Sequence, residues 1–172
     1  DILRLWVASA DYHADIRISP EILKQISDNY RKLRNTARYC LSNLYDFNPD
    51  SDMVSNDELE ELDKYALMKL DEVLEIARNA FEVYDYHTAH SLHNFCVVEM
   101  SNFYFDVLKD RLYTSAPESK TRRAAQTVLY KVLDALTLIL TPILAFTADE
   151  IWLAMPHDKS RNGESPLFNE IP

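Results

Sequence analysis

Glycine is almost absent from this chain, because Gly163 is the only one among 172 residues. Tight hairpin turns, phosphate-binding loops and dinucleotide folds depend on glycine, which enters their backbone conformations without the cost of a Cβ atom. The seven prolines leave residues 21–48 and 50–116 uninterrupted. These two features exclude most sheet-rich architectures and every glycine-rich nucleotide site. They predict an all-α fold.

The spacing of apolar residues predicts where the helices lie. Ser19-Pro20-Glu21 has the composition of a helix start, and Ser55–Glu58 and Thr147–Glu150 have the spacing of capping boxes. We therefore expect a short helix over 2–10, long helices over about 20–45, 55–83, 89–111 and 117–141, and a last short helix from residue 147. Five or six such helices joined by short loops form an antiparallel bundle over residues 1–156, and residues 157–172 form a loop tail.

A basic cluster interrupts an acidic chain. The formal net charge is −10, and residues 50–85 carry twelve acidic against three basic side chains. The sequence Arg-Lys-Leu-Arg-Asn-Thr-Ala-Arg lies inside the predicted second helix, and at about 100° per residue four of its side chains share one face: Arg31, Arg34, Asn35 and Arg38. Guanidinium groups match phosphate oxygens, and an amide can address an exposed base. A solvated face with salt bridges is the alternative interpretation.

Two smaller basic clusters lie elsewhere. Lys109 and Arg111 come at the end of the predicted fourth helix, and Arg122 and Arg123 come near the start of the fifth. Both pairs could meet RNA phosphates, although cations near a helix C-terminus also interact favourably with the helix dipole. Tyr104 and Tyr113 are candidate surfaces for base stacking.

The sequence indicates neither a catalytic centre nor a metal site. His87, His90, His93 and Cys96 recur every three residues, but each such step turns a helix by about 300°, so the outer two lie on opposite sides. Cys40 and Cys96 cannot form a disulfide framework, and they are expected as small buried residues. We also expect Trp6 and Trp152 to be core residues.

Several blocks resemble, in order, bacterial-type isoleucyl-tRNA synthetase of class Ia. The blocks that carry the resemblance are Asp1–Ser9, Leu33–Arg38, Leu62–Leu67, Tyr86-His87, Leu92–Cys96, Ser101–Tyr104, Lys109–Tyr113, Arg122–Gln126 and Asp149–Trp152. They are similar to the helical bundle of that family that binds the tRNA anticodon. The abrupt start without an initiator methionine suggests a piece of a longer protein.

The resemblance implies docking of the anticodon arm of isoleucine tRNA in the cytoplasm, with the catalytic domain on the same polypeptide. It implies a tRNA-binding role for Arg31, Arg34, Asn35 and Arg38, and for Lys109 and Arg111. The family's ATP-binding motifs are not found in the sequence, so no cofactor is expected in this chain, whereas ATP and zinc are implied for the full-length enzyme. The piece itself is expected to be monomeric, without catalytic activity and away from membranes.

Two alternatives remain open at this point. The chain could be the equivalent domain of a valyl-type relative. It could also be a helical protein-interaction module that uses the acidic third helix as its partner surface.

Overall fold

The computed structural model describes residues 1–11, 13–86 and 89–172, and those residues contain helices and loops but no strand. The elements run in chain order as follows: α1 (Ile2–Ala8), α2 (Pro20–Asn43), the 3₁₀ turn η1 (Asn56–Glu58), α3 (Glu61–Glu82), α4 (Ala89–Asn94), the π-helix η3 (Phe95–Tyr104), α5 (Phe105–Thr114), α6 (Lys120–Leu140), α7 (Ala145–Ala154) and the 3₁₀ turn η4 (Pro166–Phe168). The predicted all-α fold is confirmed.

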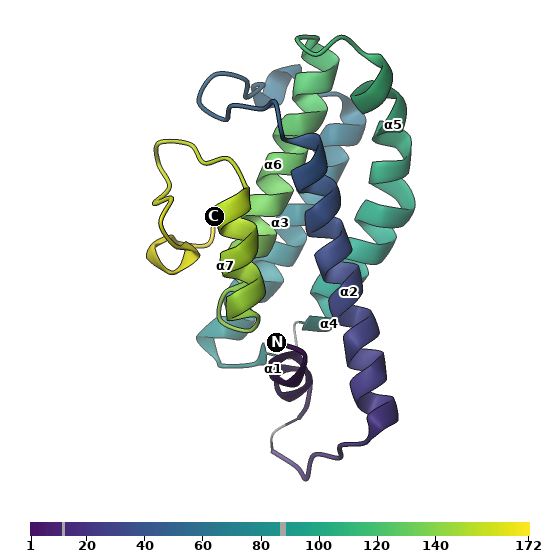
Figure 1. Cartoon of the computed structure of the whole chain (residues 1–172), viewed down its shortest axis with the longest axis vertical. Helices are drawn as coiled ribbons and strands as arrows, with labels where there is room; N and C mark the ends of the chain where they lie inside the picture. Colours follow the sequence, from purple (N-terminus) through teal and green to yellow (C-terminus); the bar gives the residue numbers. More distant parts are fainter. Residues whose placement is uncertain (12, 87–88) are drawn as a thin grey trace.

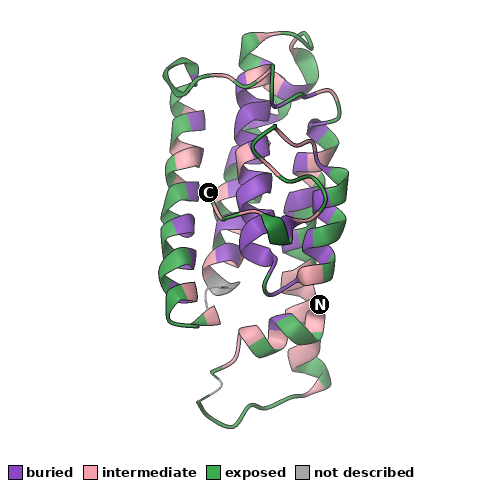
Figure 2. Cartoon of the chain, turned by 90° about the vertical axis from the view of Figure 1, so that its left-hand side faces the viewer, coloured by how far each residue is buried: buried purple, intermediate pink, exposed green. Residues whose placement is uncertain are grey.

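The long helices form an antiparallel bundle around α6 (Figure 1). α2 runs up the bundle, α3 returns, the segment α4–η3–α5 runs up again and α6 comes back down, while α1 lies at the lower end. Most residues of α6 are buried, and Figure 2 shows this central helix in the burial colour along most of its length. The surrounding helices pack on α6 and keep their outer faces exposed.

The start of α2 agrees with the sequence pattern. Ser19 is the N-cap and its hydroxyl accepts a hydrogen bond of 3.3 Å from the backbone N–H of Ile22, while Pro20 occupies the first helical position. The helix buries Leu33, Ala37 and Cys40 on one face. The opposite face of α2 is therefore free to carry the polar cluster.

The predicted start of α3 is wrong. Ser55 and Glu58 do contact each other, but they belong to the short turn η1. α3 begins at Glu61, and its capping box is formed by Glu60 and Asp63. Two capping-box spacings follow each other within a few residues here, and the second one is used because it places Asp63, which has no exposed surface, inside the bundle.

The predicted capping of α7 is also wrong, because its N-terminus is capped by a residue from the far end of the chain. Thr147 lies inside α7, and its backbone N–H donates a 2.8 Å hydrogen bond to the carboxylate of Asp1. The Thr147 hydroxyl donates to the same carboxylate oxygen. Glu150, which the capping-box spacing assigned to the cap, faces α2 instead.

The predicted fourth helix is divided into α4, η3 and α5. Helical spacing of apolar residues along this segment favours Phe103 and Val107 as core residues, but their side chains are exposed. The buried positions instead recur every four residues, at Leu92, Cys96, Met100, Tyr104, Leu108 and Leu112. The wider turn of the π-helix explains this spacing, because i→i+5 bonding adds residues to each turn and keeps every fourth residue facing inward.

The two tryptophans differ in burial. Trp152 is fully buried, as expected, and its indole N–H donates a 3.1 Å hydrogen bond to the carbonyl of Asn162. Trp6 is only half-buried, and it belongs to the short helix α1, which lies at the end of the bundle. Residues 157–172 pack against the bundle, where Arg161 forms a 2.5 Å ion pair with the buried Asp134 of α6.

Candidate nucleic-acid interface

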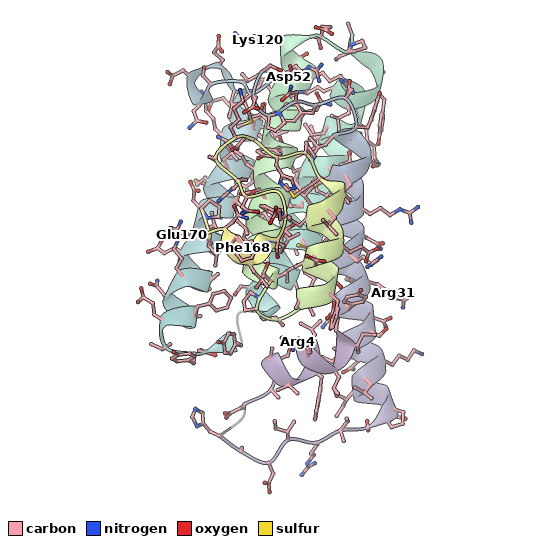
Figure 3. The ribbon with its side chains drawn as sticks, turned by 60° about the vertical axis from the view of Figure 1, so that its left-hand side comes forward. Arg4, Arg31, Asp52, Lys120, Phe168 and Glu170 are labelled. Atoms are coloured by element: carbon pink, nitrogen blue, oxygen red, sulfur yellow. The ribbon has the colours of Figure 1, made fainter. Side chains whose placement is uncertain are left out.

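The outer face of α2 presents the predicted cluster to solvent. Arg31, Arg34, Asn35 and Arg38 are all exposed. Figure 3 shows Arg31 on the outer side of α2, directed away from the bundle. Lys32 is exposed on the same helix. It was not among the predicted site residues, although its charge and its place within the basic cluster indicate a possible phosphate contact. The predicted face of basic and amide side chains is therefore exposed and lies beside the core.

The members of this face differ in whether their charge is already paired. Arg31 pairs with Asp28, one turn earlier on α2. Arg34 pairs across helices with Glu150 of α7. Among the residues that the structure describes, none forms an ion pair or a side-chain hydrogen bond with Arg38. Arg38 is therefore the cation of this face with the most complete capacity to bind a phosphate.

The Arg34–Glu150 pair is bidentate. The two terminal nitrogens of Arg34 donate to the two carboxylate oxygens of Glu150, each at 2.7 Å. Hydrogen bonding to Arg34 lowers the pKa of Glu150 below its usual range, and the same contact raises the pKa of Arg34. Both groups are therefore charged at neutral pH, and the pair is the one fork-to-fork contact on this face that the described residues make.

A chain of hydrogen bonds leads from this pair to the start of the polypeptide. Arg34 donates to the hydroxyl of Tyr30 at 3.3 Å, and the Tyr30 and Thr147 hydroxyl oxygens lie 3.0 Å apart. Because the Thr147 hydroxyl donates to Asp1, it accepts from Tyr30. The side chain of Arg34 is thus oriented by residues from α2, α7 and the N-terminus.

Arg111 is used inside the fold rather than on its surface. Its terminal nitrogens donate to the two oxygens of Asp63 at 2.9 and 2.8 Å, and one of them also donates to the carbonyl of Thr121 at 2.8 Å. The hydroxyl of Tyr104 donates to the same carboxylate at 2.6 Å. Lys109 is exposed and pairs with Asp106 at 2.5 Å. Of this predicted pair, only Lys109 is presented to solvent.

Arg122 and Arg123 tie the start of α6 to the loop after α2. Arg122 is 4% exposed and forms a bidentate pair with Asp46 at 2.6 and 3.0 Å. Arg123 donates to the carbonyl of Asp46 at 2.8 Å and to Gln126 at 2.9 Å. The buried Gln126 in turn donates to Asp46 at 2.8 Å. This cluster is a structural network that leaves little guanidinium surface for a ligand.

Comparison with known proteins places this arrangement in a family. The sequence model described as the anticodon-binding domain of tRNA ligase matches residues 63–172, which is more than half of the chain. The chain belongs to this family of anticodon-binding domains. The match begins in α3, so the basic face of α2 lies before it.

Curated relatives match over a longer stretch. The isoleucine–tRNA ligase of Caldanaerobacter subterraneus subsp. tengcongensis is 56% identical over the whole chain. The isoleucine–tRNA ligase of Syntrophotalea carbinolica is 53% identical over the whole chain, and that of Symbiobacterium thermophilum is 57% identical over 91% of it. The chain spans about a fifth of the length of these relatives, with shares of 19%, 19% and 17%.

The two candidate residues for base stacking in this anticodon-binding domain, Tyr104 and Tyr113, differ in burial. Tyr104 is completely buried and bound to Asp63, so the prediction that it is a stacking surface is wrong. Burial raises the pKa of its hydroxyl, and the neighbouring carboxylate raises it further. Tyr113 at the end of α5 is 64% exposed and keeps an accessible ring face. The π-helix causes the difference, because it turns Tyr104 inward.

The lower end of the anticodon-binding domain carries an apolar groove of about 1120 Å³. α1, the turn after α3 and the link between α6 and α7 line it. Leu3, Val7, Val83 and Tyr84 contribute exposed apolar surface. Arg4 crosses its floor and donates to the carbonyls of Pro142 and Ile143 at 2.9 and 2.7 Å, which satisfies carbonyl groups just beyond the end of α6.

The prediction that His87, His90, His93 and Cys96 form no metal site falls partly outside the described residues, since His87 and the side chain of His90 are not among them. Among the residues that are described, no three His, Cys, Asp or Glu side chains are placed to hold a metal ion. Cys40 and Cys96 are buried and unpaired by a disulfide, as expected of small core residues. No helix in the described ranges is long and apolar enough to cross a membrane.

Proposed function

We propose that this chain docks a tRNA through its anticodon arm, as one part of a longer cytoplasmic tRNA ligase. Isoleucine tRNA is the proposed partner, because the relatives that match the whole chain are named isoleucine–tRNA ligases. Attachment of isoleucine with ATP, and any zinc, would belong to the rest of that polypeptide. Two observations support this assignment: the described side chains include no group of three metal ligands, and a glycine-rich phosphate loop cannot be built around the single glycine, Gly163.

The observation that carries the proposal is the unpaired charge of Arg38 on the exposed face of α2. A cation with no partner among the described residues, in a chain of net charge −10, gains the most from a polyanion. Asn35 lies beside it with an exposed amide that can address a base or a ribose. Arg31 and Lys109 are exposed, but each must leave an acidic neighbour to meet a phosphate.

The RNA-binding residues predicted from the sequence therefore divide by accessibility. Arg31, Arg34, Asn35, Arg38 and Lys109 form the proposed interface. Arg111, Arg122 and Arg123 would act indirectly, by holding the helices that present it. Tyr113 is the proposed stacking residue, because its ring is exposed.

Salt dependence of tRNA binding tests this proposal. In the full chain, Arg38→Ala should weaken binding of an isoleucine tRNA transcript and reduce the magnitude of the slope of log K against log salt by about 0.7 to 0.9. Glu61→Ala, on the acidic face of α3, is the control, because Glu61 is 95% exposed and should leave binding unchanged or slightly tighter. The proposal is wrong if Arg38→Ala folds normally and binds tRNA with the affinity and slope of the parent.

A second surface is proposed for contact with the remainder of the longer polypeptide. The groove at the lower end exposes Leu3, Val7, Val83 and Tyr84 beside one another, and a contiguous apolar patch usually marks a contact surface. Val7→Asp should lower the melting temperature of the longer polypeptide while leaving that of the 172-residue chain unchanged. Leu153→Asp, at an exposed site on α7, is the control. Equal effects of Val7→Asp in both proteins would contradict this assignment.

A further inference from the structure

We propose that Glu150 is a specificity-determining residue, because its carboxylate competes with RNA phosphates for Arg34. The inference rests on the proposed function and deepens it. It concerns which tRNA gains binding affinity from the basic face of α2. Glu150 itself comes from α7, a helix that sequence reasoning did not connect with RNA.

The geometry places the carboxylate where a phosphate would bind. A guanidinium recognises a phosphate through two parallel N–H···O bonds, and Glu150 already accepts that pair of bonds from Arg34 at 2.7 Å each. The remaining N–H of one terminal nitrogen is directed to Tyr30 at 3.3 Å. A phosphate that uses this fork of Arg34 must therefore displace Glu150, and one that approaches the Nε edge of the guanidinium meets the Glu150 carboxylate as a like charge nearby.

The pair is accessible to such an exchange. The side chains of Arg34 and Glu150 are 43% and 62% exposed. An exposed ion pair contributes little to stability, so RNA can break it, but the pair still subtracts from what a phosphate gains. Arg31, the preceding basic residue of this face, pairs with Asp28 and does not share Glu150.

The consequence differs between tRNAs. Non-cognate binding rests on phosphate contacts that carry no sequence information, whereas cognate binding adds contacts to bases. An acid that weakens a phosphate contact changes the ratio of the two affinities when Arg34 meets a phosphate in the non-cognate complex and a base in the cognate one, and this difference is part of the proposal. Specific interfaces commonly use a repulsive element of this kind. Glu150 thus improves discrimination at some cost in affinity.

Substitution of Glu150 tests the inference with a matched control on the same helix turn. Glu150→Gln keeps the size of the side chain and removes the charge. Asp149→Asn removes the same charge from an exposed residue that forms no ion pair among the described residues. Both variants of the full chain are titrated with an isoleucine tRNA transcript and with a non-cognate tRNA transcript over a range of salt concentrations.

Glu150→Gln should tighten binding of the non-cognate transcript about two- to fivefold, which is the affinity equivalent of an exposed ion pair. The magnitude of its salt slope should rise by about 0.7 to 0.9, since Arg34 becomes available to a phosphate. Binding of the isoleucine transcript should tighten less, so the ratio of the two affinities falls. Asp149→Asn should change neither the ratio nor the slope by a comparable amount.

A double mutant separates the exchange from general electrostatics. In an Arg34→Ala background, Glu150→Gln should lose its extra effect and behave like Asp149→Asn. Equal effects of the two acidic substitutions in the parent overturn the inference. A Glu150→Gln variant that binds both transcripts more weakly, with an unchanged melting temperature, overturns it too. If Arg38→Ala leaves tRNA binding unchanged in the same assay, the proposed function itself fails and the inference fails with it.

Discussion

Replacement of Arg111 distinguishes a structural from an RNA-binding role for a residue that the sequence pattern assigned to the interface. Arg111→Met keeps the length of the side chain and removes both charge-assisted bonds to Asp63. Asp63 has no exposed surface, and it would keep only the bonds from Tyr104 and from the backbone N–H of Glu60. Loss of one partner from a buried ion pair costs about 3 to 5 kcal/mol, because the other charge remains buried.

This free energy converts to a measurable fall in melting temperature. The unfolding entropy of a domain of this length is about 0.36 kcal/mol per kelvin, so the loss corresponds to about 8 to 14 °C. Thermal unfolding followed by circular dichroism gives the number directly. Lys109→Met is the matched control on the same helix, and it should cost less than about 0.5 kcal/mol because Lys109 is 56% exposed.

A tRNA titration of Arg111→Met below its melting temperature completes the comparison. The salt slope should equal that of the parent, because Asp63 already holds the charge of Arg111. A melting temperature within about 3 °C of the parent, together with a smaller salt slope, would refute the reasoning and return Arg111 to the interface.

Three further predictions follow from the core and its charges. Trp152→Ala should lower the free energy of unfolding by about 3 to 5 kcal/mol in urea titration, because the ring is fully buried; a loss below about 1 kcal/mol would contradict this. The Arg122 guanidinium lowers the pKa of Asp46, so Asp46 contributes stability above its unfolded-state pKa that is lost as the pH falls through the lowered value. Asp46→Asn should therefore flatten the fall in urea midpoint below about pH 4, and an unchanged profile would count against the pair. Burial raises the pKa of the Cys40 thiol, and it raises that of Cys96 to about 12, so a thiol reagent at pH 8 should modify both cysteines in urea and neither in the native protein; rapid native labelling would show that they are accessible.

Local signals in the sequence were sufficient for α2. The Ser19 cap, the proline at the first helical position and the apolar stripe through Leu33 and Ala37 all act within a few residues of one another. Such interactions form in any context that leaves the helix intact, so they can be read without knowing the fold. The same reasoning located α6, whose end precedes Pro142.

The caps of α3 and α7 could not be assigned in this way. The spacing of Thr147 and Glu150 satisfies the capping-box pattern, yet the acceptor for the N-terminal N–H groups of α7 is Asp1, 146 residues away. Capping requires a carboxylate at the helix end and does not depend on where in the chain that carboxylate originates. The phase of the segment after Asn94 was likewise decided by packing, because the π-helix keeps Tyr104 and Leu108 inside the bundle.

The sequence by itself determined that this chain is a helical bundle with a basic face on α2, since periodicity and charge are local properties. Only the tertiary structure decided which cations on the chain are available to a ligand. Arg111 and Arg122 find their acidic partners 48 and 76 residues away, and Arg34 finds Glu150 at a separation of 116 residues, whereas Arg38 meets none among the described residues. Pairing of charges depends on distance in space, and that distance is created by the packing of helices remote in the chain.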